Sequence, residues 1–133
     1  MREGWLPRGG LAVLRPEVLA MAERIRFAAG DAAALTPPPG QRSVRVLARG
    51  SIEVKYYKPI ATDKQEPHTR DELYVVIGGT GWFRCGDKRE RFVPNDVLFA
   101  PADAVHRFED FSDDFATWVV FYGPEGGEGA SWT

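Results

Sequence analysis

Beyond residue 40 the chain breaks into short β-prone runs separated by turn residues, and this pattern limits the possible folds more than any other feature. Each run is four to eight residues long. The runs are Ser43–Ala48, Ser51–Lys58, Glu72–Ile77, Gly81–Cys85, Glu90–Val93, Asp96–Ala100, His106–Asp110 and Phe115–Tyr122. Strands of this length at such regular spacing predict an all-β sandwich or barrel, and not alternating βαβ units.

One stretch before these runs favours a helix. Pro16 suits the first turn of a helix. Between Glu17 and Ala29 the apolar residues recur near helical spacing, and Gly30 follows as a typical stop. The sequence therefore predicts one amphipathic helix over about 16–29.

The proline-rich run Thr36–Gly40 (TPPPG) marks a boundary, because proline fixes φ and lacks the N–H that a helix or central strand needs. A chain of 133 residues is typical of one domain. We expect an N-terminal segment over 1–40 whose helix packs on the main body, a β-barrel over 41–123, and a flexible, glycine-rich tail over 124–133.

Composition narrows the classes of partner. The net charge is −2, without the Lys/Arg-dense stripe that nucleic-acid binders display, so we expect no nucleic-acid partner. The apolar runs are much shorter than the roughly 18–20 residues of a membrane span, and the first residues lack the apolar segment of a signal peptide. Cys85 is the single cysteine, which fits a reducing compartment. We expect a cytoplasmic protein without a membrane partner.

The two histidines of the chain, His68 and His106, are candidate metal ligands. Residues two apart in an extended segment point the same way, so Glu66 shares a face with His68, and Glu72 at even spacing can share it too. His106 begins another β run after a turn. Imidazole and carboxylate groups that converge from different strands can hold a metal ion and leave coordination positions open. Spacing alone leaves the alternative that each histidine is a hydrogen-bonded core or rim residue.

The two stretches resemble the two motifs of the cupin family. The first is similar to G-x5-H-x-H-x3–4-E-x6-G, with His68 as its second histidine and with Glu72 and Gly79 at the required spacings. The second is similar to G-x5-P-x-G-x2-H-x3-N, with Pro101 and His106 in place. The resemblance implies a double-stranded β-helix (jelly-roll, cupin) barrel with one divalent metal ion per chain, Fe, Mn, Zn or Ni.

Several positions depart from the cupin motifs. Ile60 stands at the opening glycine of the first motif. In the second, Asn95 and Asp103 replace the two glycines, and Asp110 replaces the terminal asparagine. Asn and Asp tolerate left-handed backbone better than other non-glycine residues, so we expect both turns to survive.

The most consequential departure is Glu66, which stands where the motif has its first histidine. The resemblance implies a site of three histidines and one glutamate. Here the metal ligands are either Glu66, His68, Glu72 and His106 or only the last three, and Gln65 is a further candidate if a bulge turns it inward. If Glu66 does not bind the metal, it is a natural general base and the candidate catalytic residue.

Four residues are candidates for the wall of a substrate pocket. Tyr74 and Phe108 each lie two residues after a proposed ligand and on its face. Tyr56 or Tyr57 can supply a hydroxyl at the mouth, with Tyr57 our choice although strand parity does not decide between them. Gln65 is the fourth candidate.

These observations support three classes of function. A metal-dependent enzyme would transform a small polar metabolite, either by dioxygenase-like chemistry or by Lewis-acid isomerase or lyase chemistry. A non-catalytic module would bind a small ligand, with a structural metal or none. An interaction protein would use its exposed sheet to form a dimer. We expect a homodimer, formed through the exposed sheet or by exchange of an N-terminal segment.

Overall fold

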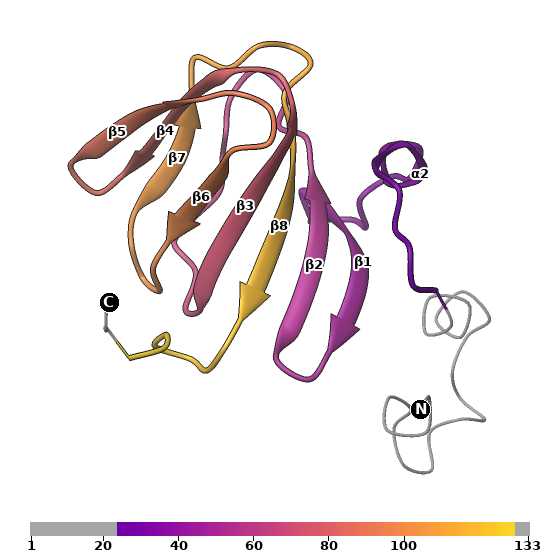
Figure 1. Cartoon of the computed structure of the whole chain (residues 1–133), viewed down its shortest axis with the longest axis horizontal. Coiled ribbons are helices and arrows are strands. Elements are labelled where there is room, and N and C mark those ends of the chain that lie inside the picture. The colour runs from indigo at the N-terminus through magenta and orange to yellow at the C-terminus, as the bar shows by residue number, and fades with distance from the viewer. Residues whose placement is uncertain (1–23, 130–133) are drawn as a thin grey trace.

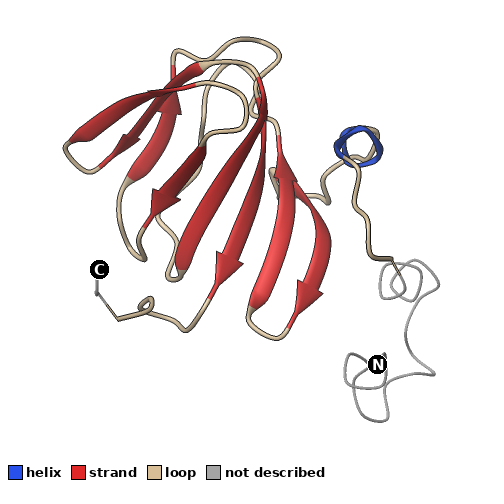
Figure 2. Ribbon diagram, viewed as in Figure 1, coloured by secondary structure: helices blue, strands red, loops and turns tan. Residues whose placement is uncertain are grey.

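The computed structural model describes residues 24–129, which form one short helix and eight strands (Figures 1 and 2). The elements are α2 (Ala29–Ala33), β1 (Ser43–Arg49), β2 (Ile52–Tyr57), β3 (Asp71–Gly78), β4 (Gly81–Cys85), β5 (Lys88–Phe92), β6 (Val97–Ala100), β7 (His106–Glu109) and β8 (Ala116–Tyr122). Each of the eight predicted strands is present, with bounds within two residues of those predicted. No helix of the described part is long and apolar enough to cross a membrane.

The strands form two antiparallel sheets that face each other as a jelly-roll barrel (Figure 1). The larger sheet has the order β1-β2-β8-β3-β6, and the smaller has the order β5-β4-β7. A cluster of aromatic side chains fills the space between them, including the fully buried Tyr74, Phe92, Phe108 and Phe115. The predicted all-β fold is therefore confirmed.

The backbone conformations at the motif turns confirm the predicted tolerance of Asn and Asp. Asn95, Asp103 and Asp110 have φ values of 75°, 66° and 48°. Gly79 has φ +81°, and a Cβ atom there would lie 2.4 Å from the Cα atom of Phe115. The glycine that ends the first motif is thus required by both its conformation and its close packing.

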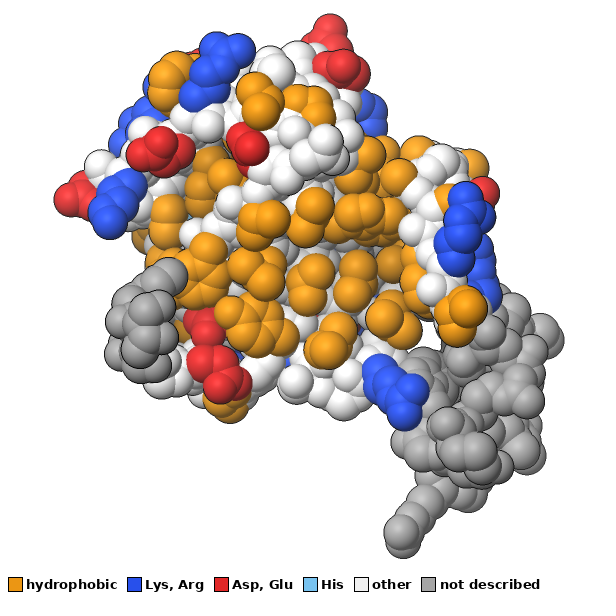
Figure 3. All heavy atoms as spheres, viewed as in Figure 1, with side chains coloured by type: hydrophobic (Ala, Val, Ile, Leu, Met, Phe, Trp, Pro, Cys, Tyr) orange, Lys and Arg blue, Asp and Glu red, His pale blue; other side chains and the backbone are white. Residues whose placement is uncertain are grey.

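The outer face of the larger sheet is apolar across all five strands. Two rows of paired residues cross it: Val97, Val75, Trp118, Tyr56 and Val44 in one, and Phe99, Leu73, Val120, Val54 and Leu47 in the other. Val97 is 63% exposed and Val75 37%. Figure 3 shows this face as a broad hydrophobic area. We call these ten residues the outer apolar face.

The N-terminal segment differs from the prediction. Residues 16–23 of the predicted helix lie outside the described part, 24–28 are not helical, and Gly30, the predicted stop, lies inside α2. No side chain caps α2 at its N-terminus. Instead, the buried Ala32 packs against Val46 and Tyr56 at the β1–β2 edge of the larger sheet. Packing on the barrel, and not local sequence, determines where this helix forms.

The segment predicted to be a flexible tail is held against the barrel as far as Glu128. The carboxylate of Asp71 accepts hydrogen bonds from the backbone N–H groups of Ala102 and Glu128, at 2.9 and 2.8 Å. The N–H of Gly126 donates to the carbonyl oxygen of Thr69. The buried Asp71 therefore ties the segment after β8 to the loop after β6.

Candidate metal centre

Three of the predicted ligands meet at one end of the barrel. His68 lies in the loop before β3, Glu72 on β3 and His106 at the start of β7. One ligand atom from each lies within 4.8 Å of the others. Glu72 and His106 are buried, because Glu72 and Tyr74 on β3, like His106 and Phe108 on β7, alternate toward the core. Among the described residues, Glu66 is not part of this cluster.

The orientation of His106 leaves one ring nitrogen available to a metal. Its Nδ1 lies 2.8 Å from the carbonyl oxygen of Ala104, which can only accept, so Nδ1 carries the proton and Nε2 of the neutral ring has the free lone pair. This is the way in which metal-binding histidines are usually held.

Two buried polar atoms in the cluster lack a hydrogen-bond partner. Nε2 of His106 and Oε1 of Glu72 are 3.1 Å apart, yet neither makes a hydrogen bond of acceptable geometry. Buried polar atoms nearly always have a hydrogen-bond partner, so two that face each other without one need an explanation. A metal ion bound by both atoms would explain the pair, and the residues present therefore fit a metal of the kind that the sequence predicts.

The electrostatics of the cluster favour positive charge beside Glu72. Burial lowers the pKa of His106, but the Glu72 carboxylate and the Ala104 carbonyl outweigh burial, and the pKa is raised overall. Burial lowers the pKa of the more open His68, whose ring packs edge-on against Phe121 at 4.9 Å between centres. The lowered pKa favours the neutral form of His68, which is the form that binds metals.

A buried carboxylate that the sequence analysis missed, Asp63, organises the surroundings. It accepts hydrogen bonds from the hydroxyl of Tyr57 at 2.5 Å, from the side-chain and backbone N–H groups of Gln65 at 2.7 and 3.2 Å, and from the backbone N–H of Phe108 at 2.8 Å. The amide oxygen of Gln65 in turn accepts from the hydroxyl of Tyr74 at 3.0 Å. Asp63 thus connects the loop after β2 to strands β2 and β7.

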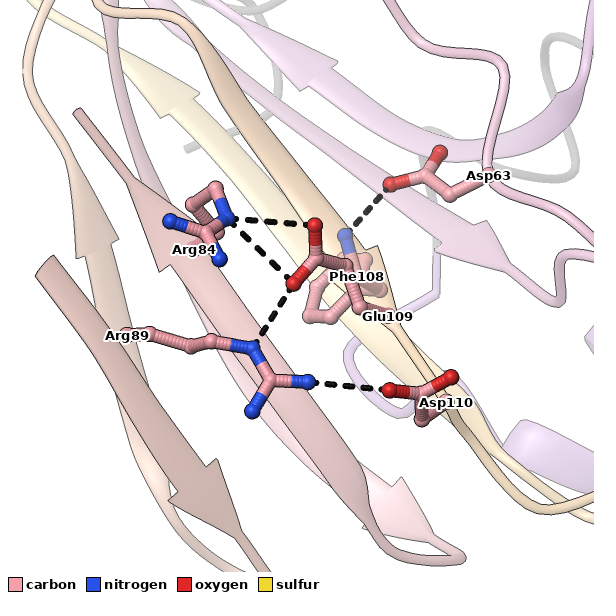
Figure 4. A network of polar contacts seen from close by, with 6 residues as sticks. All are labelled: Asp63, Arg84, Arg89, Phe108, Glu109 and Asp110. Atoms are coloured by element: carbon pink, nitrogen blue, oxygen red, sulfur yellow. Dashed lines mark hydrogen bonds and ion pairs between the residues drawn. The ribbon is translucent and has the colours of Figure 1, made fainter. Parts of the chain in front are cut away.

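The strand that carries His106 is also fixed on its other side (Figure 4). Glu109 on β7 accepts from Arg84 at 3.1 Å and from Arg89 at 2.8 Å, and Arg89 also binds Asp110 at 2.9 Å. Since Asp63 holds the backbone of Phe108 between these contacts and His106, β7 is restrained along its length.

A cavity of about 340 Å³ adjoins the cluster. His68 and Glu72 contribute to its wall, together with three of the predicted pocket or catalytic residues, Tyr57, Gln65 and Glu66. Strand register settles the choice between the two tyrosines, because Tyr57 faces inward opposite the buried Thr117 and Tyr56 packs on Trp118 at the outer apolar face.

The other two predicted pocket residues do not line this cavity. Tyr74 and Phe108 are 0% and 1% exposed, and their rings pack edge-to-face in the core at 4.9 Å. They lie on the predicted face, but the aromatic cluster between the sheets covers them. Tyr74 reaches the site through its hydroxyl, which donates to Gln65, and through its ring, whose centre lies 6.2 Å from the centre of the His106 ring.

Comparison with known proteins identifies the family. The family model of the AraC-like ligand binding domain matches residues 56–126, which include all three clustered residues. The chain belongs to this family. The domain is 36% identical over 64 residues to an uncharacterized protein of Streptomyces coelicolor, and the match covers 48% of this chain and 61% of that protein.

Solved structures place the domain in the cupin fold. A cupin 2 conserved barrel domain protein from Salinispora arenicola is 20% identical, with 75% of this chain and 88% of that chain covered and a TM-score of 0.57. A cupin superfamily protein from Desulfitobacterium hafniense is 18% identical, with 74% and 92% covered and a TM-score of 0.54. At these identities the likeness concerns the fold, and it confirms the cupin resemblance seen in the sequence.

Proposed function

We propose that this AraC-like domain binds one divalent transition-metal ion through His68, Glu72 and His106 and uses the open coordination positions to hold a small polar ligand in the adjoining cavity. The observation that carries the proposal is the pair of buried, unsatisfied atoms, His106 Nε2 and Glu72 Oε1, beside a neutral His68. Two imidazoles and one carboxylate suit Fe(II), Mn(II), Zn(II) or Ni(II) and leave positions for ligand oxygens. When bound, such a metal acts as a Lewis acid toward a ligand oxygen.

The test is metal binding by the protein purified without a histidine tag and stripped of metal. We expect one equivalent per chain from at least one of the four ions. His106→Gln and Glu72→Gln should each weaken metal binding more than about 100-fold, because each removes a proposed direct ligand. Loss of a residue that only hydrogen-bonds to a ligand typically costs roughly 10–100-fold in metal affinity. Glu90→Gln, an exposed change on β5, is the matched control and should bind normally. Uptake below roughly one tenth of an equivalent by folded wild-type protein would contradict the proposal.

Within this proposal, Glu66 faces the bound ligand and not the metal. It lines the cavity but is exposed and outside the three-residue cluster. From this place its carboxylate can accept a hydrogen bond or a proton from a ligand held beside it. Glu66→Gln should keep full metal occupancy, and loss of metal from a folded Glu66→Gln protein would show instead that Glu66 is a ligand.

We also propose that the part of the outer apolar face that the α2 segment leaves open, around the exposed Val97 and Val75, is the contact between two copies of the chain. None of the ten residues of the outer apolar face is charged, so its partner must offer an apolar surface. The same face of a second copy is such a surface, and two-fold symmetry would place the two faces against each other. Alternatives such as a heteromeric partner would leave the isolated protein monomeric.

Sedimentation analysis tests the homodimer. We expect twice the chain mass of 14.8 kDa, and Val97→Glu should shift the protein to monomer because it buries an unpaired charge. Val93→Glu is the control, since Val93 is exposed outside this face. A monomeric wild-type chain, or a dimer that persists in Val97→Glu, would contradict this assignment.

A further inference from the structure

Lys55 is the charged residue that strands β1 and β2 contribute to the cavity wall, where it lies with Ser43 and Tyr57. In the strand pairing, Lys55 on β2 lies opposite Val119 on β8. Val119 belongs to the core between the sheets, so Lys55 projects from the inner face.

Two cations, Arg42 and Lys55, and two carboxylates, Glu66 and Glu72, line the cavity. Glu53, which is not among the lining residues, lies between Arg45 and Lys55, with one oxygen 3.0 Å from Arg45 and the other 3.8 Å from Lys55. One carboxylate therefore serves two cations. Arg42, which also lines the cavity, donates to the backbone carbonyl oxygen of Lys64, a neutral group that does not compensate its charge.

The ammonium group of Lys55 is close to the metal-binding cluster. Its Nζ lies 5.6 Å from the centre of the Phe121 ring, and the ring of His68 lies 4.9 Å from the same centre. The Lys55 side chain is only 23% exposed. A charge-assisted hydrogen bond to a partly desolvated ammonium is stronger than one formed in open water.

From this placement we propose that the cavity binds small organic acids, with a carboxylate received by Lys55 and Arg42 and a second oxygen group directed to the metal. The inference rests on the metal-dependent function proposed above and names its class of ligand. A neutral sugar or polyol would leave Arg42 with a neutral backbone partner and Lys55 with a Glu53 carboxylate that it shares with Arg45. The volume of about 340 Å³ lies at the small end of the roughly 300–1,000 Å³ found for ligand sites, which suits a metabolite of a few carbons.

The experiment compares acids with a neutral molecule of similar size. Metal content is measured first, and metal-loaded protein is then titrated in a calorimeter with malate, succinate, lactate and the four-carbon polyol erythritol. We expect at least one acid to bind and erythritol not to bind. Lys55→Gln should weaken binding of that acid at least about 10-fold while keeping the metal, since it removes one charge-assisted hydrogen bond. Lys88→Gln, exposed on β5 of the other sheet, should leave the affinity unchanged.

The outcomes separate this inference from the proposed function. If metal binds but none of the acids binds better than erythritol, or if Lys55→Gln binds them as well as the wild type, the inference is overturned and the metal site stands. If no metal binds, the proposed function fails. Acid binding to the metal-free protein that depends on Lys55 would then still support the anion subsite, and its absence would overturn that subsite as well.

Discussion

Replacing Asp63 by asparagine tests whether this buried carboxylate organises the site. The side chain is 5% exposed and accepts four hydrogen bonds. An amide of the same shape can accept on one oxygen only, so its NH2 group faces two donors. Hydrogen bonds to a charged group contribute about 1.5–3 kcal/mol each, and relief of the buried charge offsets part of the loss. We therefore expect Asp63→Asn to lower the free energy of unfolding by about 3 kcal/mol.

Urea denaturation of the metal-free protein measures this change. With a slope of about 2 kcal/mol/M, the midpoint should fall by about 1.5 M. Asp87→Asn, the same substitution at an exposed hairpin position, should change the stability by less than about 0.5 kcal/mol. Tyr57→Phe removes one of the four donors and should cost less in the Asp63→Asn background than in the wild type, because the two residues are coupled. A loss below about 1 kcal/mol in Asp63→Asn would refute the reasoning.

Two further predictions concern residues that support the site. Gly79→Ala should lower the free energy of unfolding, measured by thermal denaturation, by more than about 3 kcal/mol, because it combines a positive φ with a Cβ atom 2.4 Å from the backbone of Phe115. The control Gly86→Ala, at φ +61° with nothing within 4 Å, should lower it by about 1 kcal/mol, and equal losses in the two variants would contradict this reasoning. Hydrogen bonds from Arg89 and Arg84 lower the pKa of Glu109 below its usual range. The wild type should therefore be more stable than Glu109→Gln at neutral pH, and this difference should disappear as the pH falls through the lowered pKa and should shrink in high salt. A stability difference that persists in acid would show that the ion pairs are not its source.

The strands and the three clustered residues of the candidate metal centre could be predicted because each depends on local pattern. Alternation and turn residues determine where strands begin and end, and motif spacing identifies His68, Glu72 and His106. Asp63 could not be found in this way. It lies in an irregular loop with no periodicity, and its partners Tyr57 and Phe108 come from two different strands. A single acidic residue in such a loop is usually exposed, so only the fold reveals its burial.

Other differences between prediction and structure arise from tertiary contacts. Tyr56 and Tyr57 are equivalent in sequence, and pairing with β8 decides which of them faces the cavity. Gly30 lies within a helix because Ala32 is buried against the sheet, although glycine is a common helix stop. Tyr74 and Phe108 have the predicted parity, but the packing of the two sheets against each other buries both rings, and strand alternation does not predict how deeply a residue is buried.

The most direct test of the account is anomalous diffraction from crystals of the metal-loaded protein, recorded at the absorption edge of the bound ion. We predict one peak per chain, about 2.0–2.2 Å from Nε2 of His106, a ring nitrogen of His68 and a carboxylate oxygen of Glu72. A peak at other residues, or no peak at this cluster in crystals grown with excess metal, would contradict the assignment of the metal centre.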